Sequence, residues 1–307
     1  MWLACNDRLS YLKSTRPISL SLPDSDQKEI DFVETSFFTA GADRQLPTPT
    51  QVRALSKDID TRAQPTPIKY EELGLLVKFG PHVTTVEALN LWTVKKVFGD
   101  DIPVPEVFGW RVDKDGYTFI YMELIRGPTL EECWGTLDII EKTAINDQLS
   151  QIIGKLRNLA QDPSERFVGS INREHLLDYV FIDQPKTGPF LSVRAFNDWF
   201  ASLHQLRLGH KYDDPNRPLL PDTGEIKLTH GDLNRRNIIV ASTTPIRVVI
   251  VDWQQSGWYP DYWEYCKALF TCWYEDEWRK DYIDKFLQPQ TEVYFAFSEY
   301  VMAMGAV

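Results

Sequence analysis

The sequence is poor in cysteine, and its few cysteines are not arranged for metal binding. The four are Cys5, Cys133, Cys266 and Cys272. No two of them have C-x-x-C spacing, and none has a histidine partner nearby. Neither a zinc site nor a disulfide framework is therefore expected, and the thiols should be reduced, as is usual in the cytosol.

Positive charge and long apolar runs are also scarce. The net charge is −11, which argues against nucleic acid as a partner, because that would need a basic face, and is compatible with a cationic substrate. No apolar run approaches the roughly 20 residues that span a membrane, and the first residues lack a signal peptide's apolar segment. We therefore expect a cytoplasmic protein without a membrane partner. At 43% hydrophobic residues, the chain can form a core in one large domain or two lobes.

The most informative stretch runs from residue 228 to 265. Two short β-branched runs, Ile238–Val240 and Val248–Val251, are separated by the turn-prone segment Ser242–Pro245. This pattern predicts a loop followed by a β-hairpin.

Three polar residues flank that predicted hairpin. They are Asp232, within His230-Gly231-Asp232, followed by Asn237 and Asp252. Phosphoryl transfer requires a carboxylate that receives a hydroxyl proton, beside an amide and a second carboxylate that hold Mg²⁺. The sequence therefore predicts that these three side chains converge on a divalent ion.

The motif resembles that of the aminoglycoside phosphotransferase and choline kinase-like family, which are small-molecule kinases with a protein-kinase-like fold. In protein kinases the loop reads H-R-D-x-x-x-x-N, and the metal aspartate opens D-F-G. Here Gly231 stands in place of the arginine, Asp252-Trp253-Gln254 stands in place of D-F-G, and no A-P-E follows. These differences disfavour a protein kinase, because that arginine answers to a phosphorylated activation loop.

The resemblance, which covers about residue 74 to the C-terminus, implies an α+β fold with two lobes. We expect a bilobal protein-kinase-like arrangement, with a small β-rich N-terminal lobe and a larger, mainly helical C-terminal lobe. The expected divisions are a polar N-terminal extension at 1–66, the N-lobe at 67–124 and the C-lobe at 125–307. An insertion at 169–221 is expected to build the substrate side of the cleft. The extension could wrap the first lobe or be partly disordered.

A strand lysine and a helix glutamate precede the motif. Taken alone, Lys78 is a solvent-facing strand lysine and Glu87 is the capping-box partner of Thr84 at the start of a helix. The resemblance instead implies that Lys78 reaches the α- and β-phosphates of a nucleotide and that Glu87 holds it. It also implies an inter-lobe hinge that faces adenine, formed by Met122, Glu123, Leu124 and Ile125.

Other segments allow structural interpretations. The aromatic run from residue 258 to 265 is either a core-packing turn that leads into a helix or an aromatic wall for an amine-bearing substrate. The resemblance makes Glu264 the acid that hydrogen-bonds the catalytic-loop backbone. His230 is expected to orient the loop, because no G-x-S-x-G motif exists to supply a hydrolase nucleophile. Apolar periodicity predicts helices within 137–159, 190–208 and 291–307.

One expected element is missing. A phosphate-binding loop should precede the Lys78 strand, but the segment from Lys57 to Tyr70 contains no glycine, and backbone approach to a phosphate usually needs one. Either a shorter turn replaces the loop, or triphosphate binding is weak, or the fold has lost turnover.

Two functions follow from these observations. The first is an ATP- and Mg²⁺-dependent phosphotransferase that acts on a hydroxyl of a small polar or cationic metabolite or an aminoglycoside-like compound. In this interpretation Asp232 accepts the proton, and Asn237 and Asp252 hold Mg²⁺. The alternative is a catalytically weak or inactive kinase-like binding protein.

Overall fold

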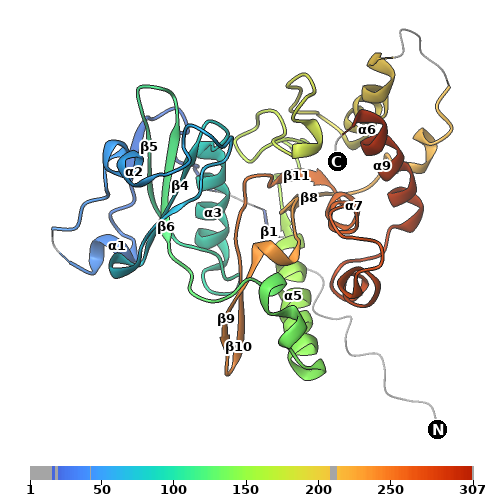
Figure 1. The fold of residues 1–307 in the computed structure, drawn as a ribbon. Coiled ribbons are helices and arrows are strands. Elements are labelled where there is room, and N and C mark those ends of the chain that lie inside the picture. Colours follow the sequence, from blue (N-terminus) through green and yellow to red (C-terminus); the bar gives the residue numbers. More distant parts are fainter. Residues whose placement is uncertain (1–15, 18–19, 42, 208–212, 306–307) are drawn as a thin grey trace.

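The protein folds into two lobes, which are described by a computed structural model over residues 16–17, 20–41, 43–207 and 213–305. The N-terminal part contains a five-stranded sheet, and the C-terminal part is mainly helical (Figure 1). The predicted α+β class with two lobes is confirmed. Within the part of the chain that the structure describes, no helix has the length and apolar character needed to cross a membrane.

The N-terminal sheet has the strand order β2-β5-β6-β4-β3, and all of its neighbours are antiparallel. Its strands are β2 (Glu29–Asp31), β3 (Ile68–Tyr70), β4 (Leu75–Gly80), β5 (Val107–Val112) and β6 (Thr118–Glu123). Leu75, Val77 and Phe79 of β4 pack with helix α2 (Pro49–Leu55) on one face. Since side chains alternate along a strand, Lys78 lies on the opposite face, toward helix α3 (Thr85–Phe98).

The segment before residue 67 packs on this lobe over its described residues from 20 onward. Strand β2 extends the sheet beside β5. Helix α2 begins after Thr48, which forms a capping box with Gln51 and is followed by Pro49 in the first turn. Of the two alternatives for this segment, wrapping of the first lobe is therefore the one observed from residue 20 onward. The domain divisions themselves remain a prediction.

The C-terminal lobe is built around helix α5 (Ile139–Arg157), whose predicted apolar stripe is buried. The hairpin predicted after the motif is confirmed as β9 (Ile238–Thr243) and β10 (Ile246–Ile250). Strands β8 (Ile226–Thr229) and β11 (Gly257–Pro260) form a second antiparallel pair. The other elements are β1 (Arg16–Pro17), which pairs with β7 (Leu159–Ala160), α1 (Ser36–Thr39), α4 (Leu130–Cys133), α6 (Val193–Ser202), α7 (Trp263–Phe270), α8 (Ile283–Phe286) and α9 (Thr291–Met304).

Short helical turns connect these elements. The 3₁₀ turns are η1 (Glu71–Leu73), η2 (Trp134–Thr136), η3 (Tyr179–Phe181), η4 (Leu203–Arg207), η5 (Arg217–Leu219) and η6 (Arg235–Asn237), and η7 (Trp278–Tyr282) is a π-helical turn. The three cysteines among the described residues are free thiols, and Cys5 lies outside those residues.

The aromatic run from residue 258 to 265 belongs to the core. Tyr259, Tyr262 and Trp263 are fully buried. Trp263 stacks on Tyr259 at 5.2 Å between ring centroids and on Phe181 at 5.5 Å. The core-packing interpretation is therefore confirmed, and the alternative of an aromatic substrate wall is wrong.

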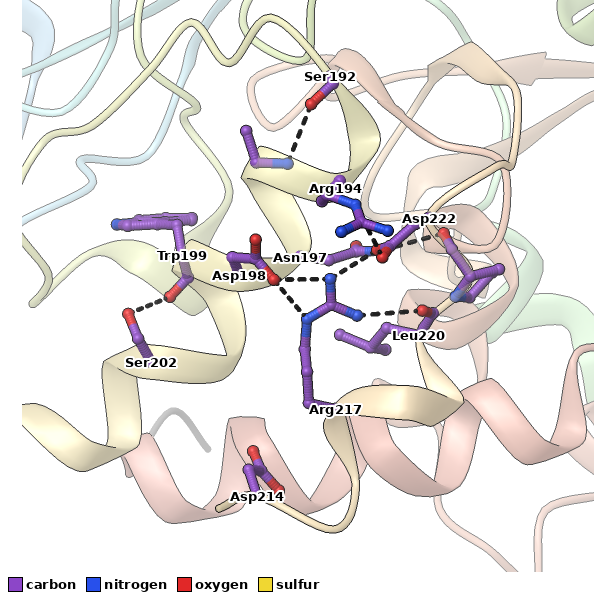
Figure 2. Close-up of polar contacts among 12 residues, drawn as sticks. Ser192, Arg194, Asn197, Asp198, Trp199, Ser202, Asp214, Arg217, Leu220 and Asp222 are labelled. Carbon is purple, nitrogen blue, oxygen red and sulfur yellow. Dashed lines mark hydrogen bonds and ion pairs between the residues drawn. The ribbon is translucent and has the colours of Figure 1, made fainter. Parts of the chain in front are cut away.

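Arg217 anchors part of the predicted insertion 169–221 (Figure 2). Its Nε donates to Asp198 Oδ1 on α6 at 2.8 Å, and its Nη2 donates to Asp222 Oδ1 at 2.6 Å. Asn197 of α6 also donates to Asp222 Oδ1 and accepts from the Tyr262 hydroxyl at 2.6 Å. These contacts tie α6 and η5 to the buried start of α7.

Candidate functional site

A cavity of about 400 Å³ is lined by residues of both lobes. Seven of the nine residues predicted for the site line it, and these are Lys78, Glu87, Met122, Glu123, Ile125, Asn237 and Asp252. Leu124 does not line it, because its side chain is buried and its backbone N–H donates to the Gly74 carbonyl at 2.9 Å. Asp232 is absent from the lining and is connected to it through Asn237, as described below.

Lys78 and Glu87 form a buried ion pair. The Lys78 Nζ lies 2.9 Å from Glu87 Oε1 and 2.8 Å from Oε2. Thr84 is the N-cap of α3 but makes no side-chain capping hydrogen bond. The capping-box and solvent-facing alternatives for these residues are therefore wrong, because β4 directs Lys78 toward α3, where Glu87 is buried.

The same lysine reaches the C-terminal lobe. Its Nζ lies 2.7 Å from Asp252 Oδ1. Burial lowers the pKa of Lys78, but the charges of Glu87 and Asp252 outweigh burial and hold that pKa above its usual value. Burial also raises the pKa of Glu87, to about 7, against the opposing effect of the adjacent Lys78 cation. Lys78 thus remains a cation between two acids.

Asp252 has a backbone conformation that few non-glycine residues adopt. Its φ is +62°, in the left-handed region, where aspartate is among the better tolerated residues. The preceding residue is held in place, because the Val251 N–H donates to the Asn237 carbonyl at 2.9 Å. This turn at the end of β10 leaves the Asp252 side chain at the cavity wall.

A buried hydrogen-bond network shapes the loop before Asp232. The Asp232 N–H donates to His230 Nδ1 at 3.2 Å, so the histidine carries its proton on Nε2, which donates to the Val251 carbonyl at 3.0 Å. The Glu264 carboxylate accepts the N–H groups of His230 and Gly231 at 2.6 and 3.1 Å. Both residues therefore have the loop-orienting contacts predicted for them.

Gly231 is required by this loop geometry. Its φ is +80°, and a Cβ atom placed there would lie 2.9 Å from the Gln255 carbonyl oxygen. A side chain at this position would strain the backbone and collide with Gln255, in the segment between β10 and β11. The local backbone conformation thus explains why glycine, and not the arginine of protein kinases, stands at this position.

Asp232 and Asn237 lie in direct contact. The Asn237 Nδ2 donates to the Asp232 backbone carbonyl at 2.8 Å and to its Oδ2 at 2.9 Å. Asn234 Nδ2 donates to Asp232 Oδ1 at 2.8 Å. Since its Nδ2 faces Asp232, Asn237 leaves its Oδ1 without a hydrogen-bond partner among the described residues.

The donor atoms at the cavity fit a magnesium ion. Asn237 Oδ1 and Asp252 Oδ2 are oxygens that make no hydrogen bond within the described ranges, and both residues line the cavity. Magnesium commonly takes one or two protein oxygens and completes its shell with water and phosphate. In the same ranges, no cluster of three or more histidine, cysteine or acidic residues could hold a metal, so a zinc-type site is not formed there.

Sequence reasoning missed a buried network beside the site. Lys267 Nζ lies 2.7 Å from Asp178 Oδ1 and 3.1 Å from Gln255 Oε1, and this Gln255 oxygen accepts the Tyr179 N–H at 3.0 Å. Burial and the charge of Asp252 raise the pKa of the Tyr179 hydroxyl to about 12. Tyr179 therefore stays protonated in the field of the site. A lysine within the apolar face of α7 was the available signal.

Tyr179 also lines a second, larger cavity. This cavity measures about 540 Å³ and includes Asp26, His82, Glu174 and Gln254 in its wall. Much of the remaining lining comes from residues 170–187, inside the predicted insertion. The segment after β10 thus borders both cavities, because Asp252 lines the 400 Å³ cavity and Gln254 lines the 540 Å³ cavity.

Comparison with known proteins identifies a family. The model of a family described as "Phosphotransferase enzyme family" matches residues 91–297, more than half of the chain. Among curated proteins, no match is found.

Solved structures of aminoglycoside phosphotransferases are similar at low identity. A thermostable APH(4)-Ia mutant in ternary complex with ADP and hygromycin B is 16% identical, with a TM-score of 0.45, covering 76% of this chain and 75% of that chain. APH(3'')-Id from Streptomyces rimosus is 16% identical, with a TM-score of 0.43, covering 78% and 91%. The type VIII aminoglycoside-3'-phosphotransferase is 15% identical, with a TM-score of 0.43, covering 74% and 84%. At such low similarity, we assign no substrate from these structures.

Proposed function

This chain belongs to the phosphotransferase enzyme family, and from that premise we propose that it is an ATP- and Mg²⁺-dependent small-molecule kinase. It transfers the γ-phosphoryl group to a hydroxyl of a small polar or cationic compound. One observation carries the proposal: Lys78 and Asp252 meet at 2.7 Å in a cavity that Asn237 also lines, and Asn237 contacts Asp232.

The chemistry assigns a role to each of these groups. Asp232 orients the acceptor hydroxyl and receives its proton as the oxygen bonds to the γ-phosphorus and the bond to the β-phosphate oxygen breaks. Lys78, kept charged by Glu87, neutralises the α- and β-phosphates. Asn237 and Asp252 would hold Mg²⁺, which when bound neutralises charge on the β- and γ-phosphates. The proposed adenine hinge consists of Met122, Glu123, Leu124 and Ile125.

The charge of the molecule supports a polar or cationic acceptor. The net charge of the chain is −11, and Asp26 and Glu174 are among the residues that line the 540 Å³ cavity. Lys186 lines the same cavity, so the wall carries both signs of charge, but its carboxylates offer partners to an amine-bearing compound. We place the acceptor in this cavity, beside Tyr179.

A second candidate function is a kinase-like binding protein without turnover. The segment from Lys57 to Tyr70 has no glycine, and this favours the candidate because glycine usually permits close phosphate approach. The contacts that join Lys78, Asp252, Asn237 and Asp232 argue against this candidate. A site without turnover has no physical need for all four residues.

Asp232→Asn tests the catalytic role. The substitution keeps the shape of the side chain but removes the base, and we expect kcat to fall by about 10²- to 10⁴-fold. ADP release is measured against a panel of hydroxylated amines, sugars and aminoglycosides, first with the wild type to find an acceptor. Asp147→Asn, on the exposed side of α5, is the matched control and should keep full turnover.

Thermal melting with ATP and Mg²⁺ separates the two candidate functions. Both the wild type and Asp232→Asn should melt at higher temperature with millimolar nucleotide, because ligand binding stabilises the folded state. Unchanged turnover in Asp232→Asn would reject the role of Asp232. A wild type that gains no stability from ATP and Mg²⁺ would reject the kinase and favour a protein that binds another ligand.

A further inference from the structure

The glycine-free segment forms part of the wall of the 400 Å³ cavity. Five of its residues line the cavity together with Lys78 and Asp252, and these are Arg62, Gln64, Pro65, Thr66 and Pro67. The segment that sequence analysis identified as lacking a phosphate loop therefore stands where a nucleotide's phosphates would lie if the proposed function holds.

The segment is a closed loop. The Asp58 carboxylate accepts the Thr66 N–H at 3.2 Å from each oxygen, and its Oδ2 accepts the Thr66 hydroxyl at 2.7 Å. Pro65 packs against the end of β4, because a Cβ atom on Gly80 would lie 2.8 Å from its Cδ. Residues 58–66 are thus fixed at both ends, next to the strand that carries Lys78.

The backbone of this loop offers few donors to a phosphate near the cavity. Pro65 and Pro67 have no N–H group, and the N–H of Thr66, between them, is already bonded to Asp58. A glycine-rich loop binds phosphate through its backbone N–H groups. Residues 65–67 cannot do so, and at these three positions phosphate recognition must come from side chains.

Arg62 is the cation that the loop presents. Its side chain is 65% exposed, and its Nε lies 3.6 Å from Asp58 Oδ2, a long and solvated contact of the kind that holds an arginine weakly. A guanidinium group matches two phosphate oxygens through paired N–H donors. Lys78, in contrast, is buried between two carboxylates.

We propose that Arg62, presented by the Asp58-closed loop, binds the phosphates of the nucleotide in place of backbone N–H groups. The inference rests on the proposed function and adds a binding residue to it. Affinity for the nucleotide's phosphates then depends on one charged, solvent-exposed side chain. Binding should therefore weaken with rising salt concentration more steeply than it would with neutral backbone N–H donors.

Calorimetric binding of ADP with Mg²⁺, and of adenosine, tests this role. Arg62→Ala should weaken ADP binding about 10- to 100-fold, the range for a lost hydrogen bond to a charged group, and leave adenosine within about twofold. Arg62→Lys should recover part of the loss, since it keeps the charge without the paired geometry. Arg194→Ala is the matched control, because Arg194 is 72% exposed and also has one carboxylate partner, Asp222, at 3.3 Å.

The possible outcomes separate a failure of the Arg62 role from a failure of the proposed kinase function. If the wild type binds ADP and Arg62→Ala binds it equally well, the role of Arg62 is overturned and the kinase proposal stands. An equal loss in Arg194→Ala overturns it too, because the effect is then one of overall charge. A wild type that binds neither ADP nor adenosine overturns both proposals. Selective loss for ADP in Arg62→Ala alone supports the inference.

Discussion

Gly231 holds a backbone conformation that side-chain-bearing residues rarely adopt, directly before the proposed catalytic aspartate. Gly231→Ala should destabilise the protein by about 1 to 3 kcal/mol, because the new Cβ atom strains a left-handed backbone and would lie 2.9 Å from the Gln255 carbonyl. Urea denaturation measures the change. Since the Gly231 N–H also donates to Glu264, in the loop that carries Asp232, turnover should fall together with stability.

Gly154→Ala provides the matched control for that substitution. Gly154 lies inside α5, and a Cβ atom there meets nothing within 4 Å. Alanine favours a helix interior over glycine by roughly 1 kcal/mol, so this variant should be as stable as the wild type or more so. If both variants behave alike, the conformation of Gly231 is not the cause of the loss.

Among single residues, local spacing could predict some parts of the site and not others. Asp232 and Asn237 are five residues apart, and a short motif brings them together. Glu87 was ambiguous, because it stands three residues after a threonine in a helix start, and only its burial beside Lys78 decides for the ion pair. Asp178 and Lys267 are 89 residues apart, and no periodic pattern links them.

At the scale of elements, long periodic segments were predictable and short ones were not. The apolar stripe of α5 and the β-branched runs of β9 and β10 each contain enough residues to specify their type. Strand β2 has three residues and lies at a sheet edge, where its pairing with β5 depends on chain packing. The closed loop at 58–66 depends on a side chain, Asp58, that accepts backbone and hydroxyl donors eight residues away.

The anchoring of α6 by Asp222 should depend on pH. Burial would raise the pKa of Asp222, but hydrogen bonds from Asn197 and Arg217 outweigh it and hold that pKa below its usual 3.8. As the pH falls, the unfolded state takes up the proton first. The stability that the Asp222 carboxylate contributes is therefore complete above its usual pKa of 3.8 and is lost as the pH falls through its lower folded-state pKa. Asp222→Asn should lower the melting temperature near neutral pH.

Circular dichroism melts from about pH 7 to pH 3 give the measurement. The gap in melting temperature between wild type and Asp222→Asn should be constant down to about pH 5 and narrow at lower pH, because protonation removes the same charge. Asp147→Asn, which alters an exposed aspartate of α5, should show no comparable gap. A gap that widens in acid would contradict the assigned direction of the Asp222 pKa.

At the scale of the whole molecule, one short segment makes several polar contacts between the lobes. Residues 252–256 follow β10, and they meet the N-terminal lobe at three points. Asp252 pairs with Lys78, the Gln254 Nε2 donates to the His82 carbonyl at 3.0 Å, and Asn90 of α3 donates to the Trp253 and Ser256 carbonyls at 3.0 and 3.2 Å. The resemblance predicted two lobes, but these contacts join residues more than 160 positions apart, which sequence spacing cannot indicate.

Asn90→Ala should weaken the coupling between the lobes. Asn90 is buried, with a side-chain exposure near zero, and its removal leaves two carbonyls without this donor, at a cost of about 2 to 4 kcal/mol in unfolding free energy. Scanning calorimetry should show a lower melting temperature and a broadened transition, because one polar link between the lobes is removed while the apolar cluster that spans both lobes remains. Nucleotide that bridges the lobes should restore a sharp transition in this variant.

Asn146→Ala distinguishes a loss of lobe coupling from the loss of any buried amide. Asn146 is buried in α5, and its side chain makes no hydrogen bond among the described residues. Its replacement leaves no partner unpaired and should cost less than about 1 kcal/mol, with one sharp transition. If Asn90→Ala also melts in one sharp transition, the lobes unfold as a unit without this link. The Lys78–Asp252 pair, the Gln254–His82 hydrogen bond and the packing across the interface would then carry the coupling.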